Sequence, residues 1–113
     1  MKFTDKLEGD IVVFDISGKI EGGEQTTLFH GKIHEFIQAG KRKFILNLER
    51  TEWMDSVGLG LLISALTTVK NAEGDVGRLV FANITSIKSI LDATGLIKIF
   101  EHYESVALAK ASF

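Results

Sequence analysis

The amino-acid sequence predicts an α/β fold: one domain over residues 1–113, with a mostly parallel central sheet, an antiparallel strand at its N-terminal edge and flanking helices. Three observations support this prediction. The length of 113 residues is typical of one domain. Short segments rich in β-branched and aromatic residues alternate with longer segments of helical period. One short segment, Phe44–Leu48, is apolar almost throughout, as expected for a parallel strand buried on both faces.

The first half of the chain is predicted to begin with two strands. Phe3–Leu7 and Ile11–Ile16 are separated by a short turn that contains glycine, so we expect them to pair antiparallel. The next segment, Glu24–Ala39, has apolar residues at helical spacing and is followed by Gly40, a residue that commonly ends helices. The buried strand Phe44–Leu48 comes next in this order.

The second half continues the alternation of helices and strands. The predicted elements are, in order, a helix over Ser56–Glu73, a strand over Leu79–Ala82, a helix that starts at a cap on Thr85 or Ser86 and ends at Gly95, a strand over Leu96–Phe100, and a helix over Ser105–Ala111. If successive strands add in one direction, right-handed crossovers place the helices between them on one face of the sheet.

Composition and charge exclude several function classes. The chain has no cysteine, which excludes disulfide frameworks and thiol catalysis. Thirteen Lys and Arg against fifteen Asp and Glu leave a net charge of −2. The one dense basic run, Lys41–Lys43, follows a predicted helix end, so we expect no direct binding of nucleic acid. The longest nearly apolar run, Val57–Leu66, is too short for a membrane span, and the N-terminus lacks a signal-peptide core; we therefore expect a cytoplasmic protein.

The most informative segment, Trp53–Leu62, joins a buried strand to a helix. Functional groups gather at the carboxyl ends of strands in open α/β sheets, and Ser56 falls at this place. An esterase elbow would need glycine where Met54 stands, and a dinucleotide fingerprint would need glycine where Ile63 stands. Two interpretations stay open: a plain helix start capped by Asp55 or Ser56, or a helix start whose Ser56 carries a covalent phosphate.

Other polar residues are interpreted as surface features. His30 and His34 lie four residues apart on a predicted helix, but a zincin motif would need Glu directly after the first histidine, so we expect no metal site. Glu49 and Glu52 are expected in a solvated loop. Trp53 is interpreted either as core or as an exposed anchor beside the serine.

The chain resembles the STAS domain family of anti-sigma factor antagonists. The segment Met54–Leu62 is similar to the family signature, Thr94–Leu96 followed by Phe100 resembles its Thr-Gly-Leu segment and later phenylalanine, and Ser17–Ile20 resembles its Gly-x-Leu/Ile stretch. The order of predicted elements also matches over nearly the whole chain.

The resemblance implies a phosphorylatable serine at Ser56, paired with Asp55. It also implies two partners: an anti-sigma factor that is a serine kinase, and a metal-dependent serine phosphatase that resets the switch. The sequence departs from the family pattern at Glu21, where Asp is frequent, at Val57, where a small residue is usual, and at Asn83, where glycine commonly ends the fourth strand.

The sequence as a whole therefore predicts a binding module that needs no cofactor and is not an enzyme. When unphosphorylated at Ser56, it would sequester the kinase and free a sigma factor. Leu61 lies off the apolar stripe of the helix, so it is expected to be free for outside contact. The predicted docking face contains Glu21, Met54, Asp55, Ser56, Val57, Gly58 and Leu61. The alternative is an accessory subunit of a membrane transport system or of a larger signalling assembly.

Overall fold

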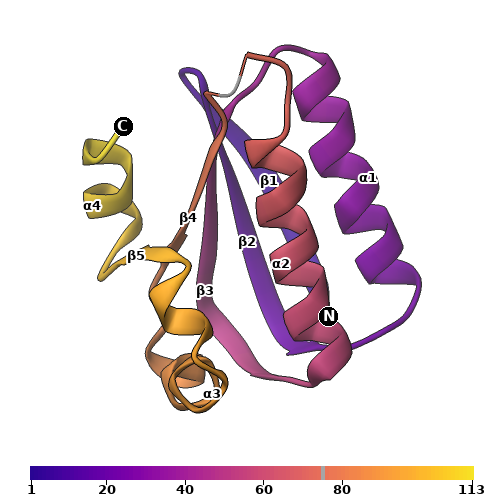
Figure 1. Ribbon diagram of the computed structural model, residues 1–113, viewed down its shortest axis with the longest axis vertical. Helices are drawn as coiled ribbons and strands as arrows, with labels where there is room; N and C mark the ends of the chain where they lie inside the picture. The colour runs from indigo at the N-terminus through magenta and orange to yellow at the C-terminus, as the bar shows by residue number, and fades with distance from the viewer. Residues whose placement is uncertain (75) are drawn as a thin grey trace.

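A computed structural model describes residues 1–74 and 76–113, and within them five strands form one sheet in the order of the chain (Figure 1). The strands are β1 (Lys2–Glu8), β2 (Ile11–Ile20), β3 (Lys43–Met54), β4 (Arg78–Ala82) and β5 (Glu101–Tyr103). β1 pairs antiparallel with β2, and every later pair is parallel. The predicted α/β class, with an antiparallel N-terminal edge strand, is confirmed.

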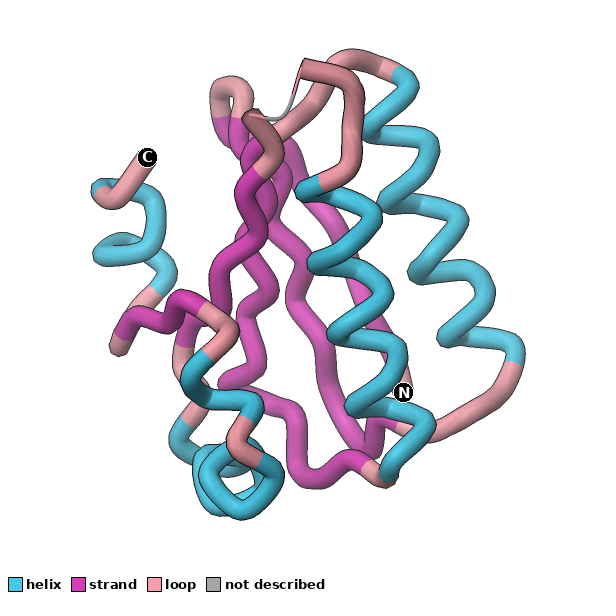
Figure 2. The backbone as a smooth tube through the Cα atoms, in the orientation of Figure 1, coloured by secondary structure: helices cyan, strands magenta, loops and turns pink. Residues whose placement is uncertain are grey.

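The helices cover the two faces of the sheet unequally (Figure 2). They are α1 (Glu24–Gln38), α2 (Ser56–Lys70), α3 (Lys88–Thr94) and α4 (Val106–Ala111), with short 3-10 turns η1 (Thr85–Ile87) and η2 (Leu96–Lys98) on either side of α3. α1 and α2 lie side by side on one face, as right-handed crossovers require, while α4 lies on the other face.

Aromatic side chains fill the main core between the sheet and α1. Phe14 and Phe29 are fully buried, and their ring centroids lie 5.0 Å apart in an edge-to-face arrangement. Phe3 packs against both of these rings, and Phe36 packs against Phe14. Full burial of one such side chain contributes about 1.5–3 kcal/mol, so this group anchors α1 to β1 and β2.

A second, smaller core lies under α4. Arg78 on β4 holds this end of the chain: it forms two hydrogen bonds with the Glu101 carboxylate, of 2.7 and 2.8 Å, and donates one of 2.7 Å to the carbonyl of Ser112. Its guanidinium lies 4.6 Å from the ring centroid of Phe113. One arginine therefore ties β4, β5 and the C-terminal segment together.

The predicted strand over Leu96–Phe100 is wrong. Gly95 adopts a left-handed conformation with φ of 74° and ends α3, and residues 96–98 continue as the 3-10 turn η2. Phe100 is buried and stacks on Phe81, and the strand begins only at Glu101. The strand β5 could not be predicted from the sequence, because an edge strand of three residues, two of them exposed, has no periodic pattern of apolar residues.

The cap expected on Thr85 or Ser86 is also wrong. Neither side chain accepts a hydrogen bond there, and the α-helix begins at Lys88 after η1. Asn83, where glycine was expected from the family pattern, has a φ of 58°. Asparagine tolerates this left-handed conformation better than most residues, so the departure leaves the end of β4 intact.

β3 is longer than predicted and continues to Met54. Its pairing with β4 ends at Asn47, but its pairing with β2 continues as far as Ile20 and Met54. Glu49 and Glu52, expected in a loop, are exposed residues of this strand. The extension carries the chain from the centre of the sheet directly to the start of α2.

Candidate functional site

The junction between β3 and α2 is built around Asp55. Its backbone is extended, and its side-chain oxygen Oδ1 accepts a hydrogen bond of 2.9 Å from the backbone amide of Gly58. Asp55 is therefore the N-cap, and Ser56 is the first residue of the helix rather than its cap. This geometry settles which of the two residues caps the helix.

Ser56 is exposed at the N-terminus of α2. Within residues 1–74 and 76–113 its hydroxyl takes part in no hydrogen bond. The helix runs to Lys70, three residues short of the predicted end. The free amides and dipole of a helix N-terminus favour negative charge, so the position would tolerate a phosphate on this oxygen.

The loop between β2 and α1 packs directly against this junction. The Asp55 backbone amide donates a hydrogen bond of 3.3 Å to the carbonyl of Ile20, which ends β2. A Cβ atom built on Gly22 would lie 3.4 Å from a methyl of Val57. The structure therefore brings exposed Glu21, from a distant part of the sequence, to the same end of the molecule as Ser56.

Two residues of the predicted docking face are not on the surface. Met54 is only 2% exposed and belongs to the main core. Gly58 is buried, and a Cβ atom there would lie 2.2 Å from the carbonyl oxygen of Ile20. Their prediction as contact residues is wrong: Met54 packs inward, and Gly58 lets α2 approach the end of β2.

Leu61 is half-buried rather than free for outside contact. It packs against the main core and also lines a shallow cavity of about 370 Å³ between α1 and α2. Val57, which is 56% exposed, lies in the same cavity. Ile63, on the same helix, is exposed. The accessible apolar surface next to Ser56 is therefore Val57 with the outer part of Leu61.

Sequence reasoning missed the contribution of α1 to this surface. Thr26, Thr27 and His30 line the cavity from the α1 side. Helical spacing alone does not reveal that this face of α1 meets α2, so no signal in the sequence identified them. Trp53, for which two interpretations were open, is 44% exposed and precedes the junction on β3.

His30 faces α2 rather than a metal site. Its Nε2 atom lies 3.2 Å from the hydroxyl of Ser64, and burial, with a smaller effect of nearby His34, lowers its pKa below the ordinary 6.5. In the described part of the chain no three side chains of His, Cys, Asp or Glu gather in a group that could hold a metal ion. The arrangement stabilises the neutral imidazole at the contact between the two helices.

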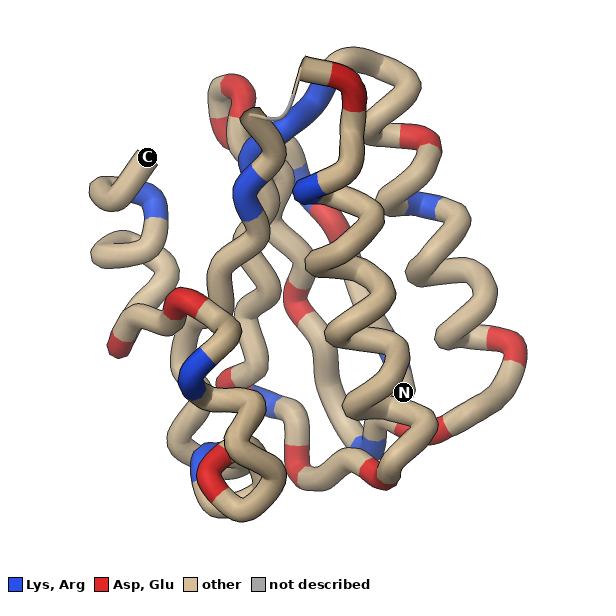
Figure 3. Tube along the Cα trace, in the orientation of Figure 1, with Lys and Arg blue, Asp and Glu red and all other residues tan. Residues whose placement is uncertain are grey.

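Charge is distributed unevenly around the junction (Figure 3). α2 carries no charged residue before Lys70, whereas Glu21, Glu52 and Asp55 lie at or near its N-terminal end. An uncharged helix with these residues at its start presents a mixed surface: apolar along the cavity and mainly acidic at the rim, where exposed Lys19 also lies, opposite Trp53 on β3. Such a surface suits a protein partner that is apolar at its centre and basic at its edge.

Comparisons with solved structures show the same fold at low sequence identity. TM1081 of Thermotoga maritima is 21% identical, with a TM-score of 0.82 over 97% of this chain and 92% of that chain. The anti-sigma factor antagonist SpoIIAA in its unphosphorylated form is 20% identical, with a TM-score of 0.73 over 98% and 96%; the Bacillus protein has also been solved in its phosphorylated form. A sulfate transporter family protein of Wolinella succinogenes is 14% identical, with a TM-score of 0.66 over 94% and 89%.

Two further findings bear on identity. No helix among the described residues is both long and apolar enough to cross a lipid bilayer. A family model described as STAS domain matches residues 3–109, which is nearly the whole chain. The chain therefore belongs to the STAS domain family.

Proposed function

We propose that this protein is an anti-sigma factor antagonist whose partner binding is switched by phosphorylation of Ser56. The observation that carries the proposal is the exposure of this serine as the first residue of α2, with Asp55 rather than Ser56 capping the helix. A kinase must bring its phosphoryl donor in line with the acceptor oxygen. An exposed hydroxyl without a structural hydrogen bond meets that requirement.

The proposed partners are an anti-sigma factor that is also a serine kinase and a metal-dependent serine phosphatase. The docking surface consists of Ser56, Val57 and the outer part of Leu61, with Glu21 and Asp55 at its acidic rim. The chain acts as a binding module in the cytoplasm, where sigma factors work, and performs no catalysis itself. This assignment is supported by the family and by the anti-sigma factor antagonist with the same fold.

Phosphorylation would reverse binding through charge. A phosphate adds about −1.5 to −2 charges at neutral pH, next to a rim that is already acidic. A charge left unpaired in an interface costs about 2–5 kcal/mol. This corresponds to a loss of roughly 30-fold to several thousand-fold in affinity, which is enough to release the anti-sigma factor.

Two variants test the switch by calorimetric titration against the cognate anti-sigma factor. Ser56→Ala removes the acceptor and should bind constitutively, since the Asp55 cap remains. Ser56→Asp adds one negative charge and should bind more weakly, with the larger loss at low salt. Thr67→Asp is the matched control: it adds the same charge to an exposed position eleven residues further along α2 and should bind like the parent.

Protein purified from its own host, together with the Ser56 variants, distinguishes the proposed function from its alternatives. Intact mass and phosphopeptide mapping of protein purified from its own host should show phosphate on Ser56, together with a co-purified kinase-like anti-sigma factor. Equal affinity of the Ala and Asp variants would refute the switch. Co-purification of a transporter ATPase, or of other STAS subunits, would favour a role as transport accessory or as part of a signalling assembly.

A further inference from the structure

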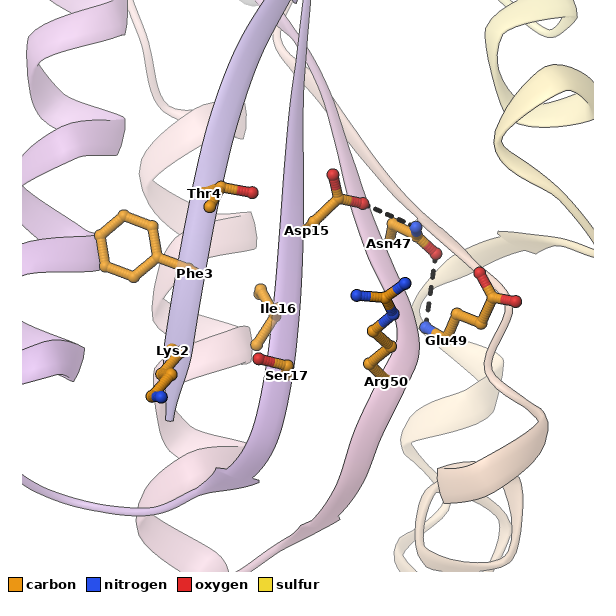
Figure 4. A pocket seen from close by; sticks show the side chains of 9 residues that line it. All are labelled: Lys2, Phe3, Thr4, Asp15, Ile16, Ser17, Asn47, Glu49 and Arg50. Atoms are coloured by element: carbon orange, nitrogen blue, oxygen red, sulfur yellow. Dashed lines mark hydrogen bonds between the residues drawn. The ribbon is translucent and has the colours of Figure 1, made fainter.

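The face of the sheet opposite α1 and α2 carries a polar pocket that the proposed switch does not use (Figure 4). α4 covers only part of this face, where Val13, Ile45 and Val80 form the second core. Beside it, over β1, β2 and β3, lies a pocket of about 380 Å³. Its polar lining includes Lys2, Thr4, Asp15, Ser17, Asn47 and Arg50.

A β-bulge in β3 turns Arg50 toward this pocket. Asp15 pairs with Asn47, but Ser17 pairs with Arg50, so two residues of β2 match three of β3. Side chains alternate between the two faces along a regular strand. In a β3 without the bulge, Arg50 would therefore face the core, as Leu48 does two residues earlier. Bulges are rare between parallel strands and frequent beside functional sites, where they redirect a side chain. The bulge therefore gives the pocket its second cation.

One row of the pocket is suited to an anionic group. Lys2, Ser17 and Arg50 lie opposite one another on three neighbouring strands, which are about 4.8 Å apart. The row thus places Ser17 between the strand positions of two cations, and the Arg50 side chain extends from its position along β3 toward Asp15 and Asn47 (Figure 4). Within residues 1–74 and 76–113, neither Lys2 nor Arg50 takes part in an ion pair. A carboxylate over this row could accept charge-assisted hydrogen bonds from both sides.

The neighbouring row is suited to a protonated amine. Thr4, Asp15 and Asn47 again lie opposite one another, two residues away along each of the first two strands. The Asn47 amide donates a hydrogen bond of 2.7 Å to Oδ1 of Asp15 and accepts one of 2.8 Å from Asn83. These bonds fix the carboxylate, while its Oδ2 accepts no hydrogen bond from the described residues.

We propose that this pocket binds a small zwitterion. Its anionic group lies over the row of Lys2, Ser17 and Arg50, and its protonated amine donates to Oδ2 of Asp15, the oxygen that Asn47 leaves free. Two cations are balanced by the carboxylates of Asp15 and Glu49, so the lining is neutral but dipolar and matches a neutral ligand with separated charges. Two residues along a strand span about 6.6 Å, and the volume of the pocket lies in the range of small-molecule sites.

A titration followed by NMR tests this proposal with three probes. 4-Aminobutanoate carries both charges, butanoate only the anion and butylammonium only the cation. The zwitterion should give saturable shifts in the backbone amides of Thr4, Ser17 and Arg50. Each single-charge probe should bind at least about tenfold more weakly, which is the effect of losing one favourable contact of about 1.4 kcal/mol. Saturation of the same amides by butanoate with equal affinity would overturn the proposal, as would the absence of saturable shifts.

Variants assign each half of the ligand to its row. Arg50→Gln, at an exposed position, should weaken the zwitterion and butanoate about tenfold and leave butylammonium unchanged. Asp15→Asn keeps a side chain able to accept from Asn47 and should weaken the zwitterion and butylammonium instead. Lys6→Gln removes an exposed charge from β1 outside the pocket and should bind all three probes like the parent. An equal loss in Lys6→Gln and Arg50→Gln would show that only net charge matters and would refute the site.

Discussion

Replacing Gly58 with alanine tests whether close contact between α2 and β2 positions Ser56. The added Cβ would lie 2.2 Å from the backbone carbonyl oxygen of Ile20 and 3.0 Å from its carbonyl carbon. A normal contact needs more than 3 Å, and the obstacle is backbone rather than a flexible side chain, so the helix start must move by about 1 Å. Forcing such a shift in a packed region costs about 1–3 kcal/mol, against a gain of up to about 1 kcal/mol in helix propensity.

Gly60→Ala is the matched control on the same helix. Nothing lies within 4 Å of a Cβ atom at Gly60, and the residue is exposed. This substitution should therefore stabilise the protein by about 0.5–1 kcal/mol, because alanine is the better helix former. The two variants have the same composition, so a difference between them reports the local geometry alone.

Urea denaturation followed by circular dichroism measures both free energies of unfolding. We expect Gly58→Ala to be less stable than the parent and Gly60→Ala to be more stable, with melting temperatures moved in opposite directions. The partner affinity of folded Gly58→Ala should also fall, since the displaced helix start carries Ser56. Equal stabilisation by both substitutions would refute the reasoning, because it would mean that the end of β2 yields without cost.

The remaining predictions concern the cap, the docking surface and the C-terminal ion pair. Asp55→Ala should lower the free energy of unfolding by about 0.5–2 kcal/mol in urea denaturation, because it removes the hydrogen bond from the Gly58 amide. Ser56→Ala should lower it by less than about 0.5 kcal/mol, because Ser56 is not the cap. The reverse order of the two effects would contradict the assigned cap. Leu61→Ala should lower stability by about 1–2 kcal/mol, roughly half the effect of a fully buried leucine, and should also weaken partner binding in calorimetry; normal binding by the folded variant would show that Leu61 is only core. Arg78 lowers the pKa of Glu101 below 4.5, so the ion pair stabilises the fold above that pH and this contribution is lost as the pH falls through the lowered value. Glu101→Gln should then be less stable than the parent at pH 7 by up to about 1 kcal/mol, since the Glu101 side chain is half exposed, and equally stable in acid. A difference that does not change with pH would exclude an ionic origin.

The sequence by itself determined the fold class and the place of Ser56 at the start of a helix. Alternating apolar strands and helical segments leave few arrangements other than a mostly parallel sheet with crossover helices. The apolar residues of Phe44–Leu48 are buried as their nearly continuous run predicts, and Ser56 begins a helix after it. These features depend on residues close together in the chain, so local patterns are sufficient to predict them.

The tertiary structure decided which residues near the serine are accessible. Met54 and Gly58 belong to the same sequence motif as Val57, yet the first two are buried and the third is exposed. Gly58 is covered by Ile20, more than thirty residues earlier, whose backbone meets the start of α2, and Met54 packs into the main core. A motif gives the order of residues but not which of them an element from elsewhere in the chain will cover.

The polar pocket was likewise invisible in the sequence. Lys2, Ser17 and Arg50 come from three strands, and only the register between these strands brings them together. The register itself depends on one bulge in β3, which reverses the side of the sheet that Arg50 faces. Because side chains alternate with a period of two, one extra residue changes the face of the residues that follow it, until the second irregularity between Gly18 and Lys19 restores the alternation and Met54 faces the core again. The position of the bulge in β3 is set by packing between segments that are distant in the sequence, and local propensity does not predict it.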